Sequence, residues 1–253
     1  MLRIGTSGWQ YRHWRGVLYP ESGPPRAWFD AYAGRFDTVE INATFYRLPA
    51  AATFESWARR APEGFLYALK FSKYGSHLKR LLEPEATIGA FVERARLLGP
   101  ALGPVLVQLP PRWNAVPARL DAFLAAAPRE MRWALEFRDP SWLVPEVLDI
   151  LRRHEAALCV HDKIPGHPQE ATADWVYLRY HGRVPGGRYG TRRLRAEARR
   201  IEGWMARGLD VYAYFNNDPH GHAVRDALQL EELMAGRAGS LSARRSRASR
   251  TPG

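Results

Sequence analysis

A carboxylate and a guanidinium stand two residues apart near the middle of the chain, in the segment WALEFR of residues 133–138. Its composition predicts a strand, and because side chains alternate between the faces of a strand, Glu136 and Arg138 project to the same side. Burying two charged groups there is unfavourable unless they pair with each other or face a cleft. Pro140 ends the strand, and Ser141 is a candidate N-cap for the next helix. The segment therefore predicts a strand that carries charged groups to a cleft.

Other apolar segments of the chain end in the same way. Glu40 with Asn42, and Arg179 with His181, are spaced to share one face of a strand. A carboxylate or a histidine can move a proton, and nearby cations can hold an anion. The candidates for proton transfer are Glu40, Glu136, His161 and His181. The candidates for substrate binding at strand ends are Asn42, Lys70, Gln108, Arg138, Arg179, Asn216, Asn217 and Asp218.

These residues are carried by short apolar runs, which we interpret as strands, and the longer periodic segments between them predict helices. The predicted strands are Leu2–Thr6, Thr38–Asn42, Phe65–Phe71, Pro104–Leu109, Arg132–Phe137, Ala157–His161, Trp175–His181 and Asp210–Phe215. The predicted helices are Ala27–Phe36, Ala52–Arg60, Ala86–Leu98, Pro117–Ala126, Trp142–His154, Thr191–Arg207 and His220–Ala235. Nearly continuous apolar strands are typical of parallel sheets covered on both faces.

Eight strands separated by helical segments predict an α/β fold, a (β/α)₈ barrel of the TIM type, as a single domain over residues 1–235. Only fourteen residues lie between Val160 and Trp175. Because a parallel crossover needs about a dozen residues or more, we expect the sixth helix to be short or missing. An open doubly wound sheet is the alternative. Active sites of such barrels lie at the C-terminal ends of the strands, where the candidate residues fall.

The loop after the first strand is rich in aromatic residues. They are Trp9, Tyr11, His13, Trp14 and Tyr19, with Arg12 and Arg15 between them. This loop is either a lid or platform on which bases or sugars stack, with Trp9 as a binding residue, or an aromatic plug over the barrel.

The loop after the seventh strand, GRVPGGRYG of residues 182–190, is glycine-rich and basic. Barrels of this type often bind phosphate with the loops after strands seven and eight and a nearby helix N-terminus. Gly186, Gly187 and Arg188 are therefore candidates for phosphate binding.

Metal binding needs clustered histidines and carboxylates, which Glu40, Glu136, His161, Asp162, His181 and Asp218 could supply. A locally spaced metal motif such as HExxH is absent, and the cations predicted for the same cleft would repel a metal ion. We expect no cofactor, with a divalent metal as the alternative. Cys159 fits a packed thiol better than a nucleophile.

The formal net charge of +11 raises the question of an acidic partner. Residues 236–253 hold five arginines and no acid, which leaves +6 for the body. We expect this tail to be disordered, and nucleic acid is a candidate partner through the tail and the aromatic loop. A G- and C-rich genome would give the same bias without such a partner. With one cysteine, no signal-peptide pattern and no run long enough to span a membrane, we expect a cytoplasmic protein without membrane contact. The oligomeric state is left open.

Several short motifs occur in a characteristic order. They are IGTSGW (4–9), VEIN (39–42) with TFYR (44–47), QLPP (108–111), EFR (136–138) with PSW (140–142), HG (181–182), and FNND (215–218) with GHA (221–223). This set resembles the YecE-like family, domain of unknown function 72, over about residues 3–233. The resemblance implies a TIM-like barrel whose reaction is uncharacterised. A suggested likeness of that barrel to metal-dependent abasic-site endonucleases implies a metal-dependent phosphodiesterase as an alternative, although the full ligand set of those enzymes is missing here.

Together these patterns predict a TIM-barrel enzyme, a hydrolase or another acid–base catalyst. Its substrate would be polar and anionic, for example phosphate-bearing, and would bind at the C-terminal rim of the barrel. A nucleic-acid-binding protein is the alternative.

Overall fold

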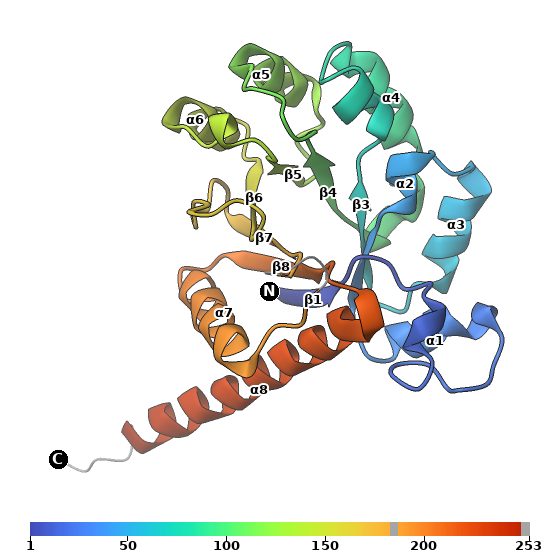
Figure 1. Ribbon diagram of the computed structural model, residues 1–253, viewed down its shortest axis with the longest axis vertical. Coiled ribbons are helices and arrows are strands. Elements are labelled where there is room, and N and C mark those ends of the chain that lie inside the picture. Colours follow the sequence, from blue (N-terminus) through green and yellow to red (C-terminus); the bar gives the residue numbers. More distant parts are fainter. Residues whose placement is uncertain (183–186, 249–253) are drawn as a thin grey trace.

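Eight parallel strands form the centre of the protein in a computed structural model that describes residues 1–182 and 187–248, with side chains as far as residue 236. The strands are β1 (Leu2–Thr6), β2 (Thr38–Ile41), β3 (Leu66–Lys70), β4 (Leu102–Gln108), β5 (Trp133–Glu136), β6 (Ala157–His161), β7 (Trp175–Tyr180) and β8 (Asp210–Phe215). Neighbours in the sequence are neighbours in space, and β1 also pairs with β8, so that the sheet curls into a barrel (Figure 1). The predicted (β/α)₈ barrel is confirmed.

The barrel closes at a short seam between β1 and β2. The two strands meet there through an isolated bridge between Ser7 and Glu40, where the Gly8 N–H donates to the Glu40 carbonyl at 2.8 Å. Gly5 permits the close approach, because a Cβ atom at that position would lie 2.4 Å from the carbonyl oxygen of Thr38. A side chain of any size would push the strands apart.

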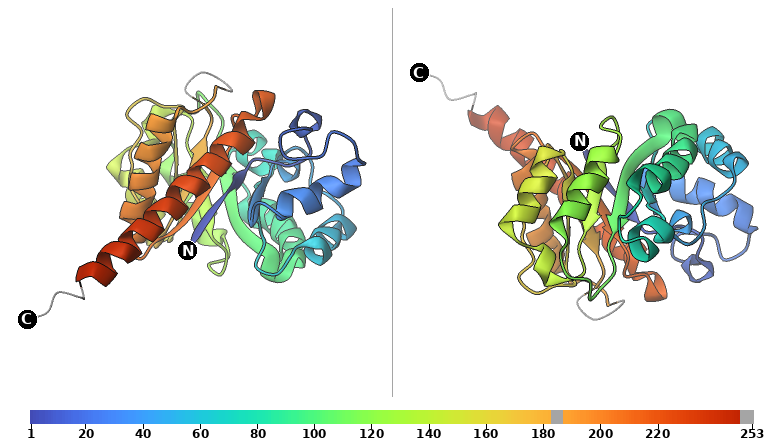
Figure 2. Two further views of the ribbon diagram at one scale, coloured as in Figure 1. Left: turned by 90° about the horizontal axis from the view of Figure 1, so that it is seen from below. Right: turned by 90° about the horizontal axis from the view of Figure 1, so that it is seen from above.

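Helices follow most strands and surround the barrel (Figure 1, Figure 2). They are α1 (Trp28–Ala33), α2 (Ala43–Tyr46), α3 (Ala51–Arg60), α4 (Pro84–Ala95), α5 (Pro117–Ala126), α6 (Pro145–Arg153), α7 (Thr191–Met205) and α8 (His222–Ala248). Short 3₁₀ turns lie at Arg12–Trp14, Pro25–Ala27, Arg96–Ala101, Pro140–Trp142 and Pro219–Gly221, and a π-helical turn lies at Tyr74–Leu78. Residues 162–174, all of which are described, form no helix, as the short connection predicted.

The apolar side chains form two separate cores. One fills the barrel and combines small residues such as Ala68 and Ala134 with large ones such as Trp175 and Tyr212. The other lies between the sheet and the helices. Interior side chains of successive strands are therefore layered, and the uppermost layer at the C-terminal ends of the strands is the polar one.

Two predicted boundaries need correction. Ser141 does not cap a long helix: Asp139 accepts the Ser141 N–H at 3.0 Å and starts a 3₁₀ turn, and α6 begins only at Pro145. The last helix continues to Ala248, so that the predicted basic tail of residues 236–253 overlaps its final turns. Residues 249–253 lie outside the described residues, and the disorder of the tail stays a prediction.

Within the described ranges, we find no helix that combines the length and the apolar character needed to cross a membrane.

Candidate active site at the barrel mouth

Arg179, on β7, joins two glutamates across the barrel. Its Nε and Nη2 donate to Glu40 at 2.9 and 2.6 Å, and its Nη1 donates to Glu136 at 2.6 Å. All three side chains are at most 1% exposed. Interior positions on β2, β5 and β7 thus meet at one level of the barrel, which the alternation of the strands predicted.

A second layer lies above this ion pair. The Arg138 Nε donates to Glu136, and the Arg138 side chain is 19% exposed, so that it reaches the opening. His181 Nε2 lies 3.5 Å from a Glu136 oxygen and 3.4 Å from Arg138 Nη2. We call Glu40, Glu136, Arg138, Arg179 and His181 the mouth cluster.

The electrostatics of the mouth cluster keep its carboxylates ionised. Burial alone would raise the pKa of Glu40, but the charge and hydrogen bonds of Arg179 outweigh it and hold that pKa below its ordinary value. Burial is likewise outweighed at Glu136, where Arg179 and Arg138 hold the pKa well below the ordinary range. Both glutamates are therefore charged, and most of their oxygen lone pairs are already engaged.

The ring nitrogens of the two candidate histidines, His161 and His181, have different hydrogen-bond partners. His161 Nε2 lies 2.7 Å from the Phe137 carbonyl, and its Nδ1 accepts the Lys163 N–H at 3.1 Å. Because a carbonyl only accepts, Nε2 carries the proton, and both ring nitrogens are occupied by backbone groups. His181 instead has side-chain partners, with Asn216 Nδ2 at 3.3 Å from its Nδ1. Burial lowers the pKa of His181 despite Glu136 beside it, so the ring is a neutral proton acceptor.

Lys70 is placed differently from the other cations. It ends β3, shares the interior face with Ala68, and is 8% exposed. Its Nζ lies 4.1 Å from the centre of the Phe45 ring, and no residue that the structure describes forms an ion pair with it. Burial and the nearby Arg179 charge lower the pKa of Lys70 to about 8. The mouth thus holds a buried amine that forms no ion pair with any described residue.

Asn42 and Gln108 border the same opening at the ends of β2 and β4. Both are half-buried, and the Asn42 Oδ1 has no hydrogen-bond partner among the described atoms. Cys159, by contrast, is fully buried 3.9 Å from Glu136, and burial and this carboxylate raise the pKa of its thiol well above the ordinary value. Cys159 therefore packs as a protonated thiol.

Asn217 and Asp218 hold loops in place. The Asn217 Nδ2 donates to the Gly187 carbonyl at 2.9 Å and to Asp226 at 2.7 Å, and Asp218 accepts the Trp14 indole N–H at 2.6 Å. These contacts tie the loop after β8 to the loops after β7 and β1. Gly186 lies outside the described residues.

Arg188 lines a cavity beside the mouth, between the β6–β7 connection and the start of α7. Its volume is about 640 Å³, and it is lined by His161, His167, Arg188, Tyr189, Arg193 and Arg200, among others. We call this cavity the side pocket. Arg188 is half-exposed and lies 3.6 Å from Asp226. The predicted phosphate loop thus borders a cationic cavity of ordinary ligand size.

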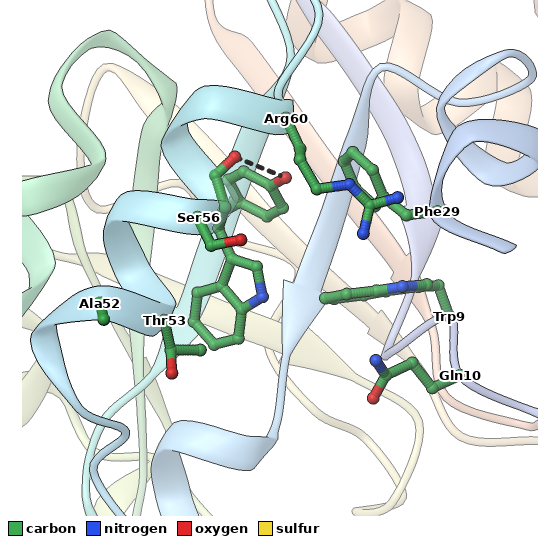
Figure 3. Close-up of a pocket in the computed structure, with 9 residues that line it drawn as sticks. Trp9, Gln10, Phe29, Ala52, Thr53, Ser56 and Arg60 are labelled. Carbon is green, nitrogen blue, oxygen red and sulfur yellow. Dashed lines mark hydrogen bonds between the residues drawn. The ribbon is translucent and has the colours of Figure 1, made fainter. Parts of the chain in front are cut away.

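Trp9 lies away from the mouth. Together with Phe29, Ser56 and Arg60 it lines a 290 Å³ pocket between β1, α1 and α3, where its ring faces the pocket (Figure 3). Trp14 and Tyr19, from the same loop, are also buried, which favours the plug interpretation of the aromatic loop over the stacking platform.

The described side chains contain no group of three or more His, Cys, Asp or Glu residues placed to hold a metal ion. The reason is visible in the mouth cluster, because Arg179 and Arg138 occupy the oxygens of Glu40 and Glu136. The donor set does not fit a metal centre there.

Two partners of Glu40 were not predicted from the sequence. The Ser7 and Tyr177 hydroxyls each donate to it at 2.7 Å. Tyr177 precedes Arg179 by two residues, so the alternation of the strand could have identified it. Ser7 stands in the polar end of β1, but the crossing of the seam that brings it to Glu40 has no sequence signal.

Residues 3–250 match the family model described as "Protein of unknown function DUF72". The chain belongs to the DUF72 family. The match continues beyond residue 233, where the motifs had suggested that the resemblance ends. Among curated proteins, this DUF72 chain is 24% identical over 271 residues to the UPF0759 protein YunF of Bacillus subtilis (strain 168), covering 92% of this chain and 95% of that protein.

Crystal structures of other DUF72 proteins share the fold. A DUF72 family protein of Thermotoga maritima MSB8, TM1631, superposes with a TM-score of 0.84 at 27% identity, covering 93% of this chain and 99% of that one. The DUF72 family protein EF0366 of Enterococcus faecalis V583 gives a TM-score of 0.78 at 21% identity, covering 93% and 96% of the two chains. These relatives share the barrel fold, and their names state no reaction.

Proposed function

We propose that the barrel mouth is the active site of an enzyme that binds a polar, anionic substrate and moves a proton on it. The observation that carries this proposal is that two cations, Arg138 and Lys70, and the His181 ring all lie near Glu136 at the barrel mouth. Lys70 has no carboxylate partner among the described residues, so an anion would supply the missing negative charge.

His181 is the proposed proton carrier. Its depressed pKa keeps the ring neutral near neutral pH, so that it can accept a proton from the substrate. Glu136, next to its Nε2, would stabilise the imidazolium that forms and hold the ring in place. In this role Glu136 acts through His181, while Glu40 and Arg179 form the charged floor of the site. His161, bound to backbone on both sides, would orient the β6 rim.

The remaining proposed binding residues surround this centre. Asn42, Gln108 and Asn216 would contact polar groups of the substrate at the opening. Arg188 would hold a phosphate group of a longer substrate at the side pocket, beside the start of α7, with Gly187 next to it in the same loop. Asn217 and Asp218 would position these loops.

Anion binding and turnover test the proposal separately. Isothermal titration with inorganic phosphate, and a screen of phosphate esters and carboxylates for turnover, would be run on the wild type and three variants. We expect Arg138→Met and Lys70→Met to weaken binding about tenfold or more, the value of a charge-assisted hydrogen bond. His181→Asn should bind but not turn over.

Arg59→Met is the matched control, because Arg59 is an exposed arginine on α3. Phosphate binding that is equally strong in Lys70→Met, Arg138→Met and the control would refute the proposed anion site. Full activity in His181→Asn would remove histidine from the mechanism.

Nucleic-acid binding, the alternative predicted from the sequence, has less support. With Trp9, Trp14 and Tyr19 buried, the aromatic loop offers only Tyr11 and His13 for stacking. A metal-dependent phosphodiesterase has no matching donor set in the described mouth. Salt-dependent binding of DNA or RNA by the full chain and by a chain ending at residue 235 would test the remaining contribution of the basic tail.

A further inference from the structure

Lysine is rare in this chain, and one of its few lysines lies inside the barrel. Of 37 basic residues only four are lysines: Lys70, Lys73, Lys79 and Lys163. Lys73 and Lys163 are exposed, and Lys79 forms an ion pair with Glu83 at 2.6 Å. Lys70 alone of the four is buried. At this position the chain uses an amine where nearly all its other cations are guanidinium groups.

The surroundings of Lys70 favour the neutral form of its amine. Its Nζ lies against the face of Phe45, and His77 packs on the same ring with a centroid distance of 4.9 Å. Both carboxylates of the mouth are bound to arginines, so neither forms an ion pair with Lys70. Desolvation and a neighbouring cation favour the neutral amine, which is nucleophilic, whereas arginine stays protonated.

Lys70 also points to where a substrate would lie. It ends a strand at the C-terminal rim, on the interior face, with Gln108 on the strand beside it. Arg138, which shares the opening, would hold an anionic group of the same molecule. A carbonyl compound carrying a carboxylate or phosphate would thus present its carbonyl carbon to the amine and its charge to the arginine.

We propose that Lys70 forms an imine with an anionic aldehyde or ketone bound in the barrel mouth. This deepens the proposed function, on which it rests, by naming the substrate class. The ammonium group first loses a proton, and the amine then adds to the carbonyl carbon, forming a C–N bond while the carbonyl oxygen becomes a hydroxyl. That hydroxyl takes up the proton and leaves as water as the nitrogen lone pair forms the C=N bond. The net change is ammonium plus carbonyl giving a protonated imine plus water.

Reductive trapping tests the imine. The full-length protein would be incubated at neutral pH with sodium cyanoborohydride and either pyruvate or dihydroxyacetone phosphate, then digested and mapped by mass spectrometry. With only four lysines and the N-terminal amine to assign, the modified site is unambiguous. A pKa of about 8 gives Lys70 on the order of a hundredfold more free amine at neutral pH than an exposed lysine. We therefore expect the adduct on Lys70 at least tenfold ahead of Lys163.

Two variants separate the imine from anion binding. Lys70→Arg keeps the positive charge but cannot form an imine, so the adduct should be lost while inorganic phosphate still binds. Lys163→Arg removes an exposed lysine and should leave labelling of Lys70 intact. Labelling of Lys70 no faster than that of Lys73 or Lys163, with both probes, would overturn the imine. Failure of phosphate to bind the wild type, with Lys70 still labelled, would overturn only the anion site.

Discussion

Lys70 is a cation of the mouth for which the described residues supply no carboxylate partner. Arg138 and Arg179 reach carboxylates, and Glu40 gains two hydroxyl donors besides its arginine. Among the described residues, the Lys70 ammonium contacts the face of Phe45 and forms no ion pair. A buried charge without a counter-ion lowers the stability of the folded state, and such residues are typical of functional sites.

Replacing this charge should stabilise the protein. We expect Lys70→Met to raise the free energy of unfolding at neutral pH by about 3 kcal/mol, the free-energy equivalent of lowering its pKa from 10.5 to about 8. The folded pKa, about 8, lies below the ordinary value of 10.5, so the unfolded chain binds more protons between these two values. The penalty is therefore full below about pH 8 and declines as the pH rises towards 10.5.

Urea unfolding of the wild type and of Lys70→Met at several pH values would measure this difference. The gap between the two should be largest at neutral pH and should narrow above pH 8. A variant that is less stable than the wild type at neutral pH would mean that Lys70 supports the fold.

In the β6–β7 connection, a single side chain supplies hydrogen bonds to the backbone at the start of β6. The Thr172 hydroxyl accepts the Leu158 N–H at 2.8 Å and donates to the Ala156 carbonyl at 2.6 Å. Thr172 is buried, and its hydroxyl bonds the residues just before Cys159, where the pairing of β6 with β7 begins.

Removing this hydroxyl should be costly. Thr172→Val keeps the shape but leaves a buried N–H and a buried carbonyl without a partner, and we expect a loss of about 1–3 kcal/mol in the free energy of unfolding. Chemical denaturation would measure it. Thr191→Val, on α7, is the control. The Thr191 hydroxyl accepts a solvent-exposed hydrogen bond from Gln229 at 2.9 Å, which water can replace, so stability should change by less than about 0.5 kcal/mol. Equal effects in the two variants would contradict the assigned role of Thr172.

The elements were the most predictable part of the protein. Periodicity gave the bounds of α5 and β6 correctly, because Pro117 and the apolar run of residues 157–160 are strong local signals. It also gave the faces of β5 and β7, and hence the meeting of Glu136 with Arg179. It could not separate His161 from His181, since that difference depends on the Phe137 carbonyl and on Asn216, which are distant in sequence. Periodicity also could not predict that Trp9 lies outside the mouth, because Trp9 is in a loop, where side chains do not alternate regularly.

At the scale of the whole molecule, the barrel depends on its seam. β1 and β8 share a full ladder, whereas β1 and β2 share one bridge, so closure rests on few contacts. Gly5 lies in this seam and has no room for a side chain.

Gly5→Ala should therefore destabilise the whole barrel. The added Cβ would meet a backbone oxygen that cannot rotate away, and we expect a loss of about 3 kcal/mol or more, as for overpacked cores. Gly89→Ala is the matched control, because that glycine lies in α4 with open space around it and should gain up to about 1 kcal/mol of helix stability. Thermal unfolding of both variants would measure the contrast. A Gly5→Ala protein as stable as the wild type would show that the seam can open without loss.

The seam also bears on how relatives should be compared. Glu40 spans it through Ser7 and anchors Arg179. Because the loss of either partner alone would leave a buried unpaired charge, we expect the pair to be retained with the fold. Lys70 differs from Glu40, because we expect a hydrophobic residue at its position to make the fold more stable. Under the proposed role of Lys70, we expect descendants of this barrel that use the same chemistry to retain the lysine, whereas the glutamate should be retained wherever the fold is.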